Sequence, residues 1–379
     1  MARAGTRSRD LLHIPRVQLA GGRAQRRSHR RSWTVTTPTS TQTSNVPSDR
    51  EPLLTVEDFS LDLAPSGEFV PVLSDVDLTV RSGEVVGLVG ESGSGKSTLA
   101  MSLMGLVPKK ISRRRSGRIA LGDIEITGAP RRALQSVRGS KIGMIFQEPM
   151  TALDPAYRVG DQVAEAIRRH TGVSRTEARK RAIENFKLVE VADAERRADA
   201  YPHELSGGLR QRVCIALAIA CRPQVLIADE PTTALDVTTQ AQVLDLLRRL
   251  RDELGMAVIL ISHDLAVIAE FCDRVMVMYA GQIVEASPID PFFIEPEHPY
   301  SSALLQSLPE NQPPLRALSV LPGSPPPLGM EVAGCRFAAR CAHMVEGTCD
   351  VAPIPLTARG DRAFRCVRAD ELDLPGAAR

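Results

Sequence analysis

A stretch rich in glycine and serine, GESGSGKST at residues 90–98, carries the clearest chemistry of the chain. It follows an apolar run of strand length at 84–89 and precedes a run at 99–104 that is typical of a helix. A strand, a glycine loop and a helix form the context of a phosphate-binding loop, because glycine lets backbone N–H groups turn inward around anionic oxygens. Lys96 would reach the β- and γ-phosphates of a nucleotide, and the Ser97 hydroxyl would ligate Mg2+.

Two carboxylates end another apolar run, VLIADE at residues 225–230. Such a run fits a buried parallel strand that delivers Asp229 and Glu230 to the edge of a sheet. There Asp229 would suit Mg2+ binding, directly or through water, and Glu230 would suit polarising an attacking water. Gln147 and His263 also end apolar runs, where Gln147 could ligate Mg2+ and His263 could touch a γ-phosphate. Taken alone, Gln147 is better explained as an ordinary polar strand end, and a lone histidine as a structural residue, although the position of His263 after a second parallel strand favours the functional role.

A second candidate anion site lies at Ser206, Gly207 and Gly208, shortly before an apolar helical run at 213–221. A serine at the start of a helix accepts a hydrogen bond from one of the first N–H groups, and the remaining free N–H groups attract an anion. The chain therefore carries two predicted anion sites that are far apart in sequence.

Taken in order, these motifs resemble the ATP-binding cassette of ABC transporters over roughly residues 53–300. The resemblance implies that ATP and Mg2+ are held by Gly90, Ser92, Gly93, Gly95, Lys96, Ser97, Thr98, Gln147 and Asp229. It implies catalytic roles for Glu230 as general base, for the switch histidine His263 and for the Q-loop residue Gln147. In this family the nucleotide lies between two cassettes, so trans contacts with ATP are implied for Ser206, Gly207, Gly208, Gln211 and Asp236.

Four short segments resemble more narrowly the ATPases of oligopeptide and dipeptide importers: residues 90–97, 146–150, 201–206 and 298–300. The resemblance implies an ATPase that energises peptide uptake as a peripheral protein on the cytoplasmic face of the cell membrane. The implied partners are a second ABC ATPase subunit, which we expect to form a heterodimer, two transmembrane permease subunits and an extracytoplasmic solute-binding protein. Leu209 departs from the family pattern, in which methionine is usual.

Other functions are weighed against this one. Nickel and glutathione importers use similar ATPases and remain alternatives. A soluble ABC ATPase acting on nucleic acid is disfavoured, because such proteins carry two cassettes or a long coiled coil, whereas only 109 residues lead from Ser97 to Ser206. The aromatic content of 4% argues against a base-stacking surface, and the net charge of +2 implies no polyelectrolyte partner. We therefore expect no nucleic-acid partner.

Four of the seven cysteines fall near the C-terminus, at Cys335, Cys341, Cys349 and Cys366. A disulfide framework is disfavoured in a cytosolic ATPase, whereas four thiolates could close a zinc site or an iron–sulfur cluster. The spacing lacks the C-x2-C pair of structural zinc sites, and the family resemblance implies a [4Fe–4S] cluster. Zn2+, free thiols and a redox-sensing role remain alternatives.

The expected fold class is α/β, a P-loop NTPase (RecA-like) core with an antiparallel β subdomain, an α-helical subdomain and a small cysteine-rich C-terminal extension. The expected domains are a disordered basic arm at 1–50, an ATP-binding domain at 51–300 with its helical subdomain at about 150–215, and the extension with the four cysteines at 301–379. The arm is rich in arginine and resembles a transit peptide in composition, but a disordered arm or a translation start placed too far upstream is favoured over that interpretation.

Smaller features complete the predictions. Phe69 is the candidate for stacking on the nucleotide base. Residues 109–118 are expected to form a basic, solvated loop, and Cys214, Cys221 and Cys272 are expected to be core residues. The longest apolar runs fall far short of the roughly 20 residues needed to cross a bilayer.

Overall fold

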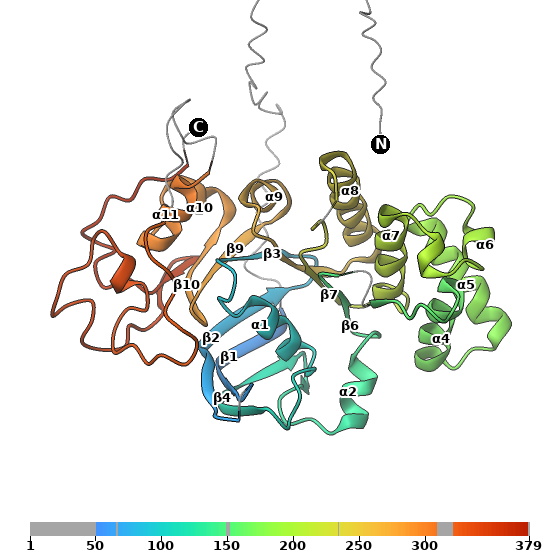
Figure 1. Ribbon diagram of the computed structural model, residues 1–379, viewed down its shortest axis with the longest axis horizontal. Helices are drawn as coiled ribbons and strands as arrows, with labels where there is room; N and C mark the ends of the chain where they lie inside the picture. The colour runs from blue at the N-terminus through green and yellow to red at the C-terminus, as the bar shows by residue number, and fades with distance from the viewer. Residues whose placement is uncertain (1–50, 66, 149–151, 234, 309–320, 378–379) are drawn as a thin grey trace, which may run out of the picture. The chain divides into compact units, whose positions relative to one another are not determined.

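The computed structural model describes residues 51–65, 67–148, 152–233, 235–308 and 321–377. Within these residues two β-sheets and a set of helices enclose the apolar interior (Figure 1). The basic arm predicted at 1–50 lies outside the described residues, and so do Pro149 and Met150 of one of the peptide-importer segments.

The central sheet has eight strands in the order β11-β12-β10-β9-β3-β8-β7-β6. Its parallel part consists of strands whose side chains are almost all buried, namely β3 (Val85–Val89), β6 (Ile142–Ile145), β7 (Val225–Asp229), β8 (Ala257–Ile261) and β9 (Arg274–Tyr279). Val258 and Leu260 enter one apolar cluster whereas Ile259 enters the other, so the core lies on both faces of the sheet. Burial on both faces explains the nearly continuous apolar runs of the sequence.

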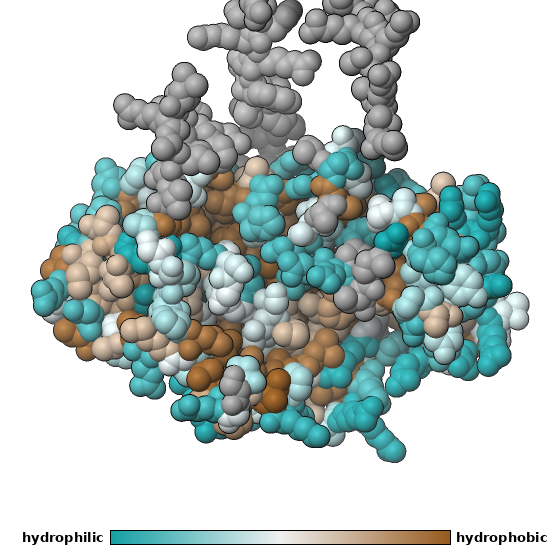
Figure 2. Space-filling view, in the orientation of Figure 1, coloured by the Kyte–Doolittle hydropathy of each residue, from teal (hydrophilic) through white to brown (hydrophobic). Residues whose placement is uncertain are grey.

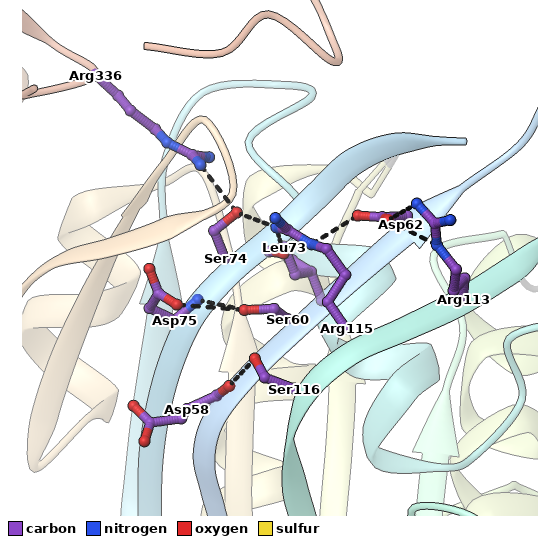
Figure 3. A network of polar contacts seen from close by, with 10 residues as sticks. All are labelled: Asp58, Ser60, Asp62, Leu73, Ser74, Asp75, Arg113, Arg115, Ser116 and Arg336. Carbon is purple, nitrogen blue, oxygen red and sulfur yellow. Dashed lines mark hydrogen bonds and ion pairs between the residues drawn. The ribbon is translucent and has the colours of Figure 1, made fainter. Parts of the chain in front are cut away.

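A second, antiparallel sheet has the order β2-β1-β4-β5, with strands β1 (Pro52–Leu63), β2 (Val70–Arg81), β4 (Ser112–Leu121) and β5 (Ile124–Glu125). The prediction of a solvated loop at 109–118 is wrong from Ser112 onward, because this segment pairs with β1. Its arginines suggested a solvated loop, but Arg113 and Arg115 both pair with the buried carboxylate of Asp62, at 2.7 and 2.8 Å (Figure 3). Beyond the short β5 this strand is an edge, where charged side chains are usual.

Among the described residues, the region predicted to be helical contains four helices, namely α4 (Val159–Thr171), α5 (Arg175–Leu188), α6 (Ala194–Arg197) and α7 (Gly207–Ala218). They gather at the end of the central sheet beyond β6 and β7 (Figure 1). Val159, Val163 and Ile167 bury one face of α4, as their helical spacing predicts. The outer surface of this region is largely hydrophilic (Figure 2), in keeping with the ion pairs along α5.

The remaining helices connect the strands or follow them. They are α1 (Lys96–Leu103), α2 (Arg131–Val137), α8 (Val237–Leu254), α9 (Leu265–Phe271), α10 (Ile289–Ile294), α11 (Pro299–Gln306) and the short turns η1 (Pro202–Glu204) and η3 (Ala338–Arg340). No helix in the described ranges is long and apolar enough to span a bilayer. Cys214 and Cys272 are buried as predicted, whereas Cys221 is only partly buried.

The C-terminal extension continues the central sheet. A hairpin of β11 (Thr357–Arg359) and β12 (Arg362–Phe364) pairs with β10 (Gln282–Pro288) through Glu285 and Ala286. The predicted boundary between 300 and 301 falls inside α11. The extension therefore takes part in the main fold through strand pairing, which its short strands do not reveal in the sequence.

Candidate nucleotide site

The phosphate-binding loop runs from β3 into α1, as predicted. Gly90, Gly93 and Gly95 adopt φ values of 149°, 79° and 108°, a region that L side chains rarely occupy. A Cβ on Gly90 would lie 2.1 Å from the Met278 carbonyl oxygen. The loop can therefore pass this close to β9 only with glycine at position 90.

This close approach gives a stability prediction. We expect Gly90→Ala to lower the free energy of unfolding by about 3 kcal/mol or more, because the new methyl meets backbone and the φ value is unfavourable. Urea denaturation of the full chain measures the change. Gly207→Ala is the matched control, since open space surrounds Gly207. Equal stability of the two variants would contradict the packing described for the loop.

Lys96 is buried at the start of α1, with 8% of its surface exposed. Its Nζ donates to the carbonyl oxygens of Gly90 and Glu91, at 2.8 and 2.9 Å. Burial lowers the pKa of Lys96, opposed by the carboxylates of Glu230 and Asp229. The ammonium is therefore held inside the loop, where it can reach the terminal phosphates of a nucleotide.

Asp229 ends β7 beside the phosphate-binding loop. Burial raises the pKa of this carboxyl, and a hydrogen bond with Ser97 opposes the rise. Its Oδ1 is buried without a hydrogen-bond partner among the described residues. An unsatisfied carboxylate oxygen next to a hydroxyl supplies the hard oxygen ligands that Mg2+ prefers, so Asp229 and Ser97 fit the predicted metal.

Glu230 gathers three polar side chains around its carboxylate. Gln147 Nε2 and Thr233 Oγ1 donate to Oε2 at 3.0 and 2.9 Å, and His263 Nδ1 lies 3.4 Å from Oε1. Burial raises the pKa of Glu230, but the hydrogen bonds from Thr233 and His263 outweigh it, so the net pKa is lowered. Glu230 is thus ionised at neutral pH, as a general base must be.

The structure brings together Gln147, Glu230 and His263, which lie far apart in sequence. The backbone of Glu230 itself has φ 47°, a strained value for glutamate that is common at functional sites. Thr233 was missed in the sequence; its place three residues after Glu230 was the available signal.

The predicted signature residues begin α7. Ser206 caps this helix by accepting from the Leu209 N–H at 3.4 Å, and both Ser206 and Gly207 are exposed. Gln211 differs from its neighbours: it is 2% exposed and donates to the Pro231 carbonyl oxygen at 2.6 Å. In this conformation Gln211 joins α7 to the residue after Glu230 and does not face outward.

Asp236 and Phe69 lie at the surface. Asp236 caps α8 by accepting from the N–H and hydroxyl of Thr239, which lowers the pKa of its carboxyl. Phe69 is 38% exposed, and the Arg113 guanidinium lies 4.8 Å above its ring. The trans contact of Asp236 and the base stacking of Phe69 remain predictions.

The four C-terminal cysteines line one small cavity of about 20 Å3, together with Phe337 and Ile354. All four are free thiols. Burial raises the pKa of Cys335 to about 11, and the neighbouring cysteines add to the rise. In the described ranges, no group of three or more His, Cys, Asp or Glu side chains is placed to hold a metal ion. The cysteines converge, but the predicted metal site is not formed as such.

Comparison with known proteins decides the family. A family model described as "ABC transporter" matches residues 73–233, and one described as "Oligopeptide/dipeptide transporter, C-terminal region" matches residues 284–349. The chain is 50% identical over 316 residues to "Putative peptide import ATP-binding protein BAB2_1052" of Brucella abortus (strain 2308), covering 83% of this chain and 94% of the relative. The chain belongs to the ABC transporter ATP-binding proteins.

Other matches agree with this family. BAB2_0817 of the same Brucella abortus strain carries the same description and is 44% identical over 335 residues, covering 85% of this chain and 99% of the relative. Among solved structures, the dimeric cassette MJ0796 in a post-hydrolysis state bound to ADP and Pi has a TM-score of 0.56 at 30% identity, covering 62% of this chain and 98% of that one. The ABC ATPase fold and ATP hydrolysis predicted from the sequence are confirmed.

Proposed function

We propose that this ABC ATPase energises the uptake of oligopeptides or dipeptides across the cytoplasmic membrane, as a peripheral subunit on the cytoplasmic face. The observation that carries the proposal is the joint presence of the cassette and the oligopeptide/dipeptide C-terminal region, in a chain that covers 94% of a relative described as a peptide import ATP-binding protein. We propose as its partners two transmembrane permease subunits, an extracytoplasmic solute-binding protein and a second ATPase subunit.

The catalytic residues support a simple order of events. Lys96 and the loop N–H groups bind the phosphates, while Asp229 and Ser97 would hold Mg2+, which would neutralise phosphate charge. Glu230 accepts a proton from the attacking water, and Gln147 and His263 orient the carboxylate that does so. Gln147 is exposed and donates to the Glu230 carboxylate, and we assign it the relay to a membrane subunit.

The second half of the site would come from another cassette. Ser206, Gly207 and Gly208 are turned to the surface or half-buried, so they are free to approach a phosphate of a neighbouring subunit. That subunit is either a second copy or, as the sequence resemblance implies, a related ATPase.

Uptake by cells tests which solute is transported. Strains carrying the wild-type chain or Glu230→Gln are compared for uptake of labelled dipeptide, labelled longer peptide, nickel and glutathione. The proposal expects peptide uptake that depends on Glu230. Glu230-dependent uptake of nickel or glutathione, with peptide uptake unchanged, would replace it with one of the alternatives.

We also propose that Cys335, Cys341, Cys349 and Cys366 hold a [4Fe–4S] cluster, with Zn2+ as the alternative. Their convergence on one cavity supports the proposal, and thiolates are the ligands that either group requires. A cluster would cross-link the extension. Among the described residues 321–377, the buried apolar side chains are Phe337, Cys349, Ile354, Phe364 and Leu374.

Metal content tests this site. The anaerobically purified full chain is expected to contain about four iron and four sulfide per chain and to absorb near 400 nm. Cys341→Ser is expected to lose most of both, whereas Cys221→Ser, at a free cysteine outside the cavity, is expected to keep them. Stoichiometric zinc without iron would select the alternative, and unchanged metal in Cys341→Ser would contradict a cysteine site of either kind.

A further inference from the structure

One residue of the phosphate-binding loop, Glu91, is held by the C-terminal part of the chain. The Arg340 guanidinium forms a two-pronged ion pair with its carboxylate, at 2.7 and 2.9 Å. The Glu91 N–H donates to the Tyr300 hydroxyl at 2.9 Å. Side chain and backbone of one loop residue are therefore both fixed by residues more than 200 positions away.

The groups that hold Glu91 are themselves firmly packed. Arg340 is 5% exposed at its side chain and also donates to the Tyr279 hydroxyl and the Pro322 carbonyl oxygen. Tyr279, Tyr300 and Phe337 form a cluster of rings with centroids 4.6 to 5.3 Å apart. A bidentate arginine–carboxylate pair of this geometry fixes orientation as well as distance.

Arg336 supports the same loop indirectly, through the turn between β9 and β10. Its guanidinium donates to the Ala280 carbonyl oxygen and to Ser74 Oγ (Figure 3). Gly281, which follows Ala280, donates its N–H to the Ser94 carbonyl oxygen at 2.8 Å. The segment 325–330 lines the same cavity as loop residues 91–94. The extension thus contacts the loop at Glu91 and braces the turn that supports Ser94.

The held residue is directly linked to Lys96. The Glu91 carbonyl oxygen accepts from Lys96 Nζ at 2.9 Å, and the Glu91 carboxylate favours the charged form of that lysine. A change in the position of Glu91 would therefore move an acceptor of the side chain that contacts the phosphates.

We propose that Arg340, supported by Tyr300, is a positioning residue that holds the phosphate-binding loop in its nucleotide-ready shape, so that the C-terminal extension sets the affinity for MgATP. Arg340 and Arg336 lie on the segment between Cys335 and Cys341. A change in the order of that segment would therefore alter the position of the phosphate-binding loop. The role of Arg340 requires neither a metal at the cysteines nor any particular solute.

Arg340→Ala tests the proposal by its effect on MgATP binding, measured by titration calorimetry on the full chain. The dissociation constant and KM are expected to rise about tenfold with little change in kcat, because the lost contact acts on binding and not on the reacting atoms. Arg340→Lys is expected to restore part of the affinity. Arg362→Ala is the matched control: it breaks another partly buried ion pair of the extension, with Glu297, without a contact to the loop.

A double-mutant cycle of Arg340→Ala with Glu91→Gln separates the positioning role of Arg340 from an effect on overall stability. Since the two residues act through one contact, Arg340→Ala with Glu91→Gln is expected to bind MgATP no more weakly than the weaker single variant. Melting temperatures are measured in parallel. Wild-type affinity in Glu91→Gln would overturn the proposal even if Arg340→Ala fails to fold, and so would equal losses in Arg340→Ala and Arg362→Ala.

Amide hydrogen exchange gives a measurement that a change in overall stability alone would not explain. By linkage, saturating MgATP is expected to slow amide exchange across residues 335–341 in the wild-type chain and to leave it unchanged in Glu91→Gln. If MgATP leaves amide exchange in this segment unchanged in the wild-type chain, the proposed coupling is contradicted.

Discussion

Lys96→Met is expected to weaken MgATP binding on the order of 100-fold, the size of effect found when one partner of a buried charge pair is removed. The reason lies in the position of the ammonium, which is buried beside the loop carbonyls and within reach of the phosphates. Titration calorimetry on the full chain gives the dissociation constant directly.

Lys187→Met provides the control for this loss. Lys187 also carries one positive charge, but it pairs with Glu195 on the exposed surface of the helical region. The control is expected to bind MgATP as the wild-type chain does. Equal affinities for MgATP in Lys96→Met and Lys187→Met would show that the loop does not bind the nucleotide.

Glu230→Gln is expected to keep MgATP affinity and to lower the steady-state rate of hydrolysis by about 100- to 10,000-fold, the usual contribution of a general base. The amide keeps the shape of the side chain but cannot accept the proton of the attacking water. Phosphate release by the transporter complex measures the rate, and Glu253→Gln, at an exposed glutamate of α8, is the control. Turnover near the wild-type rate would assign the base to another residue.

The pH dependence of turnover follows from the same residue. Because its hydrogen bonds hold the pKa of Glu230 below the ordinary value for glutamate, the carboxylate stays charged through neutral and mildly acidic pH. Loss of kcat from protonation of Glu230 is expected only as pH falls through that lowered pKa.

The nucleotide site was predictable because its motifs are local. The glycine loop, the run ending in Asp229 and Glu230, and the serine before α7 are each recognisable within about ten residues. The parallel sheet then brings the glycine loop and the two carboxylates together. Helix α8 (Val237–Leu254) is likewise bounded by local signals, with Asp236 capping its start and Gly255 following its end.

The wrong prediction at β4, and the features that the sequence did not reveal, come from contacts that no local pattern encodes. Strand β4 looked like a loop because three consecutive arginines interrupt it, and only the distant, buried Asp62 explains two of them. The inward turn of Gln211 depends on the Pro231 carbonyl, and the pairing of Glu91 with Arg340 spans 249 residues. Such long-range polar pairs appear only once the strands and the extension are placed.

This chain is expected to hold a nucleotide with one half of a composite pocket and to take the other half from a neighbouring subunit. The decisive measurement is sedimentation of the full-length Glu230→Gln chain, alone and with any ATPase subunit that co-purifies. We expect association that MgATP strengthens and that Ser206→Arg, on the exposed start of α7, abolishes while MgATP binding persists. Association that is indifferent to both MgATP and Ser206→Arg would contradict it.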